Sequence, residues 1–287
     1  MPTTQRRILT GYDGSPAAAA AIEAAARLLP GARAFIAYAW TPPFADEAMR
    51  HRLWRGASCL DEFVEAVERE GEAQARRLAA LGAAIAGLQG WDAEALIERA
   101  YGGEGALLAQ LAERSGADLI VVGSRGLGGT RALLGSVSDM TVHYASCPVL
   151  VVPHPLLEHE RAAVDGGDVL VGWDGSAGAE AARDAAARLF PGRGVVPVFV
   201  RDSEEPAGPS ATGLVTVSAE GTSLEHGRTV AAALTAESAV RRAALIAVGS
   251  RGRSALSEIM LGSVAMATLH RAYRPVLVVP HGYEARG

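Results

Sequence analysis

Two glycine-rich strings in the sequence have the composition of an anion-binding loop. VGSRGLGGTRALLGS covers residues 122–136, and VGSRGRSALSEIMLGS covers residues 248–263. Each follows an apolar run, places two glycines three positions apart, and ends in Gly-Ser about one helix length later. Glycines let backbone N–H groups approach an anion closely, and the positive end of a following helix favours phosphate. The two strings therefore predict two phosphate-binding loops.

A second pair of strings, GYDGS and GWDGS, combines a glycine turn with one carboxylate and one hydroxyl. The carboxylates are Asp13 and Asp174, and the hydroxyls belong to Ser15 and Ser176, which sit where a helix N-cap belongs. In an open α/β sheet, ligands bind outside the carboxyl ends of the strands, where the strand order reverses. We therefore expect each aspartate to share a crevice with one glycine loop.

These motifs occur twice because the chain is a tandem repeat. Residues 8–31 align without gaps to residues 169–192, and CPVLVVPH in the middle returns as RPVLVVPH near the end. A repeat of this length is a pair of domains and not a solenoid, since each copy is large enough to enclose a core. We predict a first domain at residues 1–154, a linker at 155–167 and a second domain at 168–287.

Short β-rich runs alternate with helical patterns in both copies, which predicts an α/β fold. We expect two Rossmann-like domains, each with a five-stranded parallel sheet flanked by helices. The first copy shows a long second helix around residues 61–84 and a helix near 104–115. The second copy lacks most of that second helix: we expect an exposed loop at 201–213, a strand at 214–219 and a helix at 228–243.

The composition excludes several classes of chemistry. The sequence contains no lysine, so all 27 basic residues are arginine, whereas a P-loop or a Schiff-base enzyme needs a lysine amine. A net charge of −5 is unlike that of a general nucleic-acid binder. The absence of a long apolar run and of a signal-like start predicts a cytoplasmic protein without a membrane partner. No nucleophile–base pair and no metal-ligand spacing is visible, so we predict neither catalytic residues nor a resident metal.

Taken together, the motifs resemble the universal stress protein family in its tandem-domain, ATP-binding form. The shared features are the aspartate after the first strand, a G-x2-G-x9-G-[ST] motif before the last helix, and a closing PVLVV strand. The resemblance implies that the aspartates and the ends of the second strands meet adenosine, while the glycine loops hold ribose and phosphates. It also implies that the PVLVV strands pair across the domain interface, and that this pseudo-dimer dimerises again.

The candidate ATP-binding residues come from both copies. In the first copy they are Asp13, Ser15, Ala39, Gly123, Gly126, Gly135, Ser136 and Ser138. In the second copy they are Asp174, Ser176, Val200, Gly249, Gly252, Gly262 and Ser263.

The two copies depart from the family pattern in different ways. Gly126 to Gly135 encloses eight residues, whereas Gly252 to Gly262 encloses the nine that the pattern requires. The second copy has alanine at position 265 where the first has Ser138, which removes one hydroxyl. We expect two nucleotide sites of unequal affinity, with Mg²⁺ arriving on the nucleotide.

The expected function is an ATP-binding regulator or sensor of the stress response with at most slow hydrolysis. Two alternatives stay open. The shortened first loop and the trimmed second domain are typical of a structural or interaction module that no longer binds nucleotide. An ATP-pyrophosphatase or adenylating enzyme of a related fold would carry an S-G-G-x-D-S loop, which this chain lacks. Arg125 and Arg251 are either phosphate partners or solvated loop residues.

Overall fold

The structure, a computed structural model, describes residues 5–124, 134–202, 209–219, 226–252 and 261–284. The first half contains β1 (Arg7–Gly11), α1 (Pro16–Leu28), β2 (Arg33–Trp40), α2 (Glu47–Trp54), α3 (Leu60–Leu88), β3 (Asp92–Arg99), α4 (Glu104–Ser115), β4 (Leu119–Gly123), α5 (Ser136–Tyr144) and β5 (Val149–Val152). After α6 (Glu158–Gly166), the second half contains β6 (Val169–Gly172), α7 (Ala177–Leu189), β7 (Val195–Asp202), β8 (Val215–Ala219), α8 (His226–Val240), β9 (Leu245–Gly249), α9 (Ser263–Arg271) and β10 (Val276–Val279).

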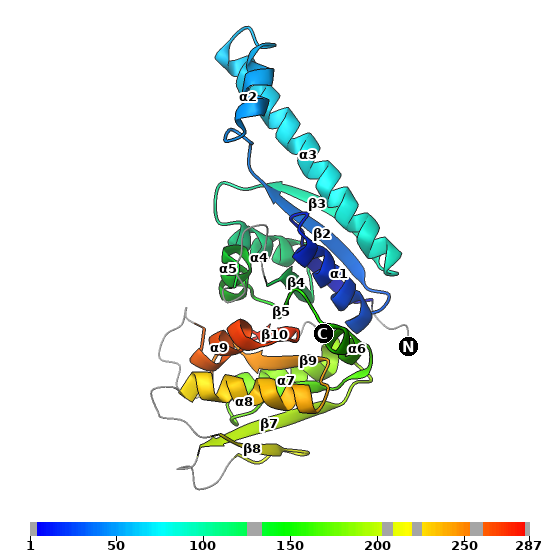
Figure 1. The fold of residues 1–287 in the computed structure, drawn as a ribbon, viewed down its shortest axis with the longest axis vertical. Coiled ribbons are helices and arrows are strands. Elements are labelled where there is room, and N and C mark those ends of the chain that lie inside the picture. Colours follow the sequence, from blue (N-terminus) through cyan, green and yellow to red (C-terminus); the bar gives the residue numbers. More distant parts are fainter. Residues whose placement is uncertain (1–4, 125–133, 203–208, 220–225, 253–260, 285–287) are drawn as a thin grey trace.

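Within the described residues, the strands form one ten-stranded sheet in the order β3-β2-β1-β4-β5-β10-β9-β6-β7-β8 (Figure 1). Each half contributes five parallel strands, and the two halves meet where β5 and β10 pair antiparallel. The strand order reverses between β1 and β4 and again between β6 and β9, which are the switch points that favour ligand binding. The predicted α/β fold and the predicted pairing of the PVLVV strands are both confirmed.

The β5–β10 joint makes the hydrophobic core continuous through the whole sheet. Leu150 pairs with Leu277 at its centre, and both side chains are fully buried. Alternate residues of the two strands point to opposite faces, so they join the two core layers on either side of the sheet. The two halves are therefore packed as one body and not as two domains on a loose tether.

Helices cover both faces of the sheet, but unequally in the two halves. Residues of α1, α3, α6 and α7 contribute to the core on one face, and residues of α4, α5, α8 and α9 to the core on the other. The second half has no described counterpart of α3. There Arg183 of α7 stacks on the Trp173 ring, and Thr216 and Ser218 of β8 are exposed. In the second half, a cation–π contact and the exposed polar residues of β8 thus replace the cover that α3 provides in the first half.

Several element boundaries differ from the sequence-based expectation. The predicted third strand and following helix of the second copy are present as β8 and α8, but α2 was not predicted. The loop predicted at 201–213 was placed two residues too early, because Arg201 and Asp202 belong to β7 and pair with β8. Residues 203–208 lie outside the described part of the chain. Helix α6 occupies most of the predicted linker at 155–167. Of the described helices, none is long and apolar enough to cross a membrane.

Candidate functional site

The glycine loops are closed at their bases in the same way in both halves. The Gly135 N–H donates to the Ser124 carbonyl at 2.8 Å, and the Gly262 N–H donates to the Ser250 carbonyl at 2.7 Å. Each hydrogen bond joins the end of one strand, β4 or β9, to the start of the next helix. The described ends of each loop therefore lie at the carboxyl edge of the sheet, beside the switch point.

The helices that follow these loops begin without a side-chain cap. Gly135 and Gly262 occupy the N-cap positions of α5 and α9, and in the described part of the chain no side chain accepts a hydrogen bond there. The next residues, Ser136 and Ser263, are exposed. Free N–H groups at the positive end of a helix are the standard backbone site for an anion. These two helix starts therefore suit phosphate.

The aspartate loops have the opposite character. Asp13 Oδ1 accepts the Ser15 N–H at 2.9 Å, and Asp174 Oδ1 accepts the Ser176 N–H at 2.9 Å. The two serine hydroxyls accept the N–H three residues further on, at 3.1 and 3.2 Å, which confirms them as N-caps of α1 and α7. These helix starts are satisfied internally, so each carboxylate offers acceptor oxygens to a hydroxyl or amino group and not a place for phosphate.

In the second half, the structure brings the aspartate and the glycine loop together. A Cβ atom on Gly252 would lie 2.7 Å from Asp174 Oδ2. Glycine at this position is what allows the carboxylate to lie against the loop. In the first half the corresponding Gly126, with Arg125, lies outside the described residues, so the matching approach to Asp13 stays a prediction.

The second-strand residues are placed differently from each other. Ala39 is half-buried and next to last in β2. Val200 of β7 is 6% exposed, and its side chain packs into the core shared with β8 and β9. Only the Val200 backbone is therefore suited to meet a ligand.

The surroundings of the two aspartates are not equivalent. In the first half, burial and then the negative charge of Asp13 raise the pKa of both Tyr12 and Tyr38. The equivalent positions are Trp173, from the gapless repeat, and Phe199, from the matching registers of β1–β2 and β6–β7. Neither residue carries an ionisable hydroxyl. The surroundings of Asp13 therefore include two phenol side chains, whereas the equivalent positions near Asp174 carry an indole and a phenyl ring.

Ser138 already has a hydrogen-bond partner. Its hydroxyl donates to the Gly123 carbonyl at 2.6 Å and is buried between α5 and the end of β4. Ala265 cannot make this bond in the second half. Ser124 also differs from its counterpart: its buried hydroxyl has no partner among the described residues, whereas Ser250 Oγ accepts the His281 N–H at 2.9 Å.

One residue at the second site was missed by the sequence interpretation. A Cβ atom on Gly178 would lie 2.1 Å from the Arg251 carbonyl oxygen, and one on Gly249 would lie 2.6 Å from the Gly178 carbonyl oxygen. The first half has Ala17 in place of Gly178, and a Cβ on Gly123 would lie 3.0 Å from its carbonyl. The end of β9 therefore packs more closely on the start of α7 than the end of β4 does on the start of α1. The glycine–alanine difference in the gapless alignment was the available signal.

No group of three or more histidine, cysteine, aspartate or glutamate side chains in the described residues could hold a metal ion. The described site instead pairs a carboxylate acceptor with backbone donors at an uncapped helix start. Such an arrangement can orient a molecule that carries hydroxyl or amino groups at one end and an anionic group at the other.

Comparisons with known proteins agree with this fold. The profile of the Universal stress protein family matches residues 4–153 and 219–280. A universal stress protein of Thermus aquaticus is 36% identical over 157 residues, which cover 51% of this chain and 98% of that protein. A universal stress protein of Mycobacterium tuberculosis is 35% identical over 187 residues, 56% of this chain; the match spans 61% of that relative's length, less than two thirds.

Solved structures extend the similarity to both halves. The crystal structure of a universal stress protein from Archaeoglobus fulgidus has a TM-score of 0.65 to this chain at 20% identity and covers 96% of each chain. At that identity the likeness concerns the fold. With the family profile matching most of the sequence, the chain belongs to the universal stress protein family.

Proposed function

We propose that this protein binds ATP in each half and acts as a nucleotide-dependent regulator of the stress response, not as a turnover enzyme. The observation that carries the proposal is the contact between Asp174 and Gly252 next to the uncapped start of α9. It combines, at one switch point, an acceptor for the nucleoside and a donor cluster for phosphate.

The donor and acceptor set fits the polarity of ATP. A carboxylate accepts hydrogen bonds from ribose hydroxyls or the adenine amino group, and it would repel phosphate. The α5 and α9 N-termini favour the phosphates by their free N–H groups and their dipoles. Mg²⁺ bound to the triphosphate would neutralise part of its negative charge. Ser136 and Ser263 offer exposed hydroxyls at the two helix starts.

A binding role suits the aspartates better than a catalytic one. Each already accepts a backbone N–H at 2.9 Å, which fixes the orientation of the carboxylate. We expect the two affinities to differ, because Gly178 packs the second loop closely on its helix and the first site has Tyr38 where the second has Phe199.

The test is the amount of adenine nucleotide released on denaturing the purified protein after saturation with ATP. We expect two ATP per chain, one after Asp13→Ala or Asp174→Ala, and none in the double variant. Asp92→Ala, which removes an exposed carboxylate at the start of β3, is the matched control and should release two.

Two outcomes would contradict the proposal. If wild-type protein binds no ATP in calorimetry at millimolar nucleotide, the glycine loops serve the fold alone, and the interaction-module alternative takes precedence. If ATP is hydrolysed at about 1 per second or faster, a rate typical of enzymes, the protein is an enzyme and not a sensor.

A further inference from the structure

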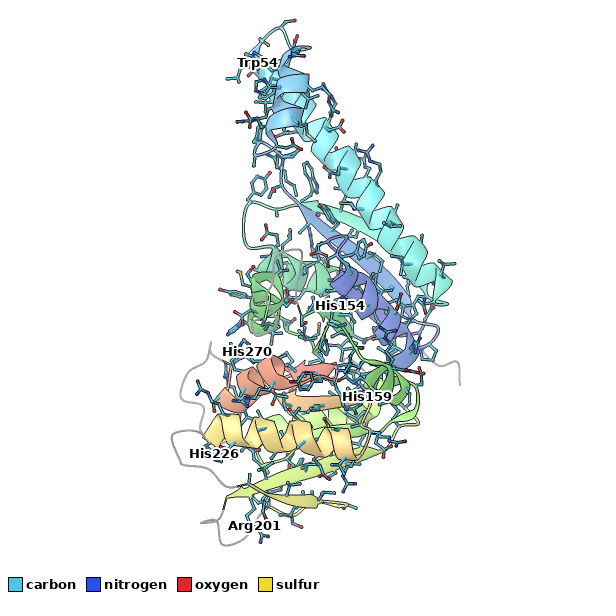
Figure 2. The ribbon with its side chains drawn as sticks, in the orientation of Figure 1. Trp54, His154, His159, Arg201, His226 and His270 are labelled. Carbon is cyan, nitrogen blue, oxygen red and sulfur yellow. The ribbon has the colours of Figure 1, made fainter. Side chains whose placement is uncertain are left out.

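The α2–α3 hairpin of the first half extends beyond the sheet. Figure 1 shows α2 and the first turns of α3 standing away from the strands, and Figure 2 labels Trp54 at this far end. We define the hairpin tip as residues 41–66, all of which are described; none of them is buried. The tip therefore adds nothing to the core of the sheet.

The tip nevertheless exposes large apolar side chains. Trp54 is 55% exposed, Leu60 63% and Phe44 39%. The Trp54 ring meets Phe63 edge to face with centroids 5.1 Å apart, so aromatic and aliphatic surface gathers where α2 ends and α3 begins. A cluster of this kind at the end of a projection is typical of an interaction surface.

Helix α2 is too short to be stable by itself. It spans eight residues, and its interior includes no buried side chain. Isolated helices of fewer than about 12 residues are marginal in water, since their stability comes from packing of an apolar face. Trp54 of α2 contacts Phe63 of α3, yet Trp54 remains 55% exposed. A partner that covers Trp54 would stabilise the hairpin.

The charges of the tip indicate which partner. Arginines cluster on α2 and just after it: Arg50, Arg52 and Arg55. Carboxylates cluster on the first turns of α3: Asp61, Glu62 and Glu65. Arg52 pairs with Glu70 and Glu65 with Arg69 inside the chain, whereas Arg50, Arg55 and Asp61 have no ion pair among the described residues. A two-fold related hairpin would set its acidic helix against the basic helix of the first.

The sheet does not offer its closing strands for this purpose. β5 and β10, which the family resemblance linked to pairing, are used within the chain. The second half has no described counterpart of the hairpin, so each chain offers this surface once. We propose that the hairpin tip is a self-association surface, at which two copies of this chain pair α2 against α3 around Trp54 and Leu60.

The experiment measures self-association of the full chain by sedimentation equilibrium over a range of micromolar concentrations. We expect a reversible dimer of twice the 29.7 kDa chain mass. Trp54→Ser and Leu60→Ser should each raise the dissociation constant about tenfold or more, since exposed anchors dominate such interfaces. Leu88→Ser is the matched control: it makes the same change at the opposite end of α3, where Leu88 is 86% exposed, and should leave the constant unchanged.

The cysteines give an independent geometric readout. Cys59 is exposed in the tip next to Leu60, and Cys147 is buried. A short bis-maleimide should therefore link two chains through Cys59, and Cys59→Ser should abolish the product. A single-chain mass at every concentration would overturn the proposal. So would a dimer that is unaffected by both tip substitutions or not linked through Cys59, because that dimer would use another surface. Circular dichroism of each variant verifies that it is folded.

Discussion

Substitution of Gly178 by alanine tests whether close packing of α7 on the second glycine loop sets the nucleotide site. The added Cβ would lie 2.1 Å from the Arg251 carbonyl oxygen, and ordinary contact starts near 3.4 Å. The helix start or the loop must therefore separate by about 1.3 Å. Both partners are backbone, so no side-chain rotation relieves the clash.

The expected cost follows from two opposing effects. Overpacking costs about 1–3 kcal/mol, and replacing a helical glycine by alanine returns up to about 1 kcal/mol. We expect Gly178→Ala to lower the free energy of unfolding by about 1 kcal/mol in urea titrations. Gly87→Ala in α3 is the matched control: its Cβ would meet nothing within 4 Å, so it should be neutral or stabilising.

The functional effect should be larger than the stability effect and confined to one site. A loop displaced by about 1 Å loses hydrogen-bond geometry to the phosphates, and one such bond is worth about tenfold in affinity. Titration calorimetry in an Asp13→Ala background monitors the second site alone, and there we expect the ATP dissociation constant to rise about tenfold or more. An unchanged constant for Gly178→Ala, or an equal loss at the first site in an Asp174→Ala background, would refute the reasoning.

Two further predictions concern stability. Leu150→Ala should lower the free energy of unfolding by about 2–5 kcal/mol in urea titrations, because Leu150 is fully buried at the β5–β10 joint. Leu88→Ala, at an exposed site, should change that free energy by less than about 0.5 kcal/mol. Equal effects of the two substitutions would contradict a role of the joint in stability. Burial, and then the charge of Asp13, raise the pKa of Tyr38 above its ordinary value of 10.0. As the pH rises above about 10, the unfolded chain releases the Tyr38 proton before the folded protein does, and the free energy of unfolding therefore falls. Tyr38→Phe should flatten this alkaline loss in urea titrations at successive pH values; the same slope in Tyr38→Phe and in the exposed control Tyr101→Phe would disprove the assignment.

The sequence determined the repeated α/β architecture because the signals for it are local. Apolar runs of strand length, Ser15 and Ser176 at N-caps, and glycine turns specify where strands end and helices begin, independently of distant contacts. The duplicated PVLVV strings likewise predicted two strands, whereas their pairing across the two halves was implied by the family resemblance. The position of the described loop ends at the carboxyl edge followed from the same alternation.

Features that depend on long-range contacts were not predictable in this way. Helix α2 has no buried residue and hence no apolar periodicity, and β7 extends to Asp202 only because β8 pairs with it. Local sequence patterns also could not show that Gly178 lies against Arg251, some 70 residues away in the chain, or that Gly252 lies against Asp174.

The sequence by itself therefore determined which elements form and which residues stand at strand ends, since periodicity and capping act over a few residues. Only the tertiary structure decided how closely the second glycine loop approaches α7, that the core is continuous between the two halves, and that the hairpin tip remains uncovered. These properties depend on distances between segments that are far apart in the chain, and local composition does not encode them.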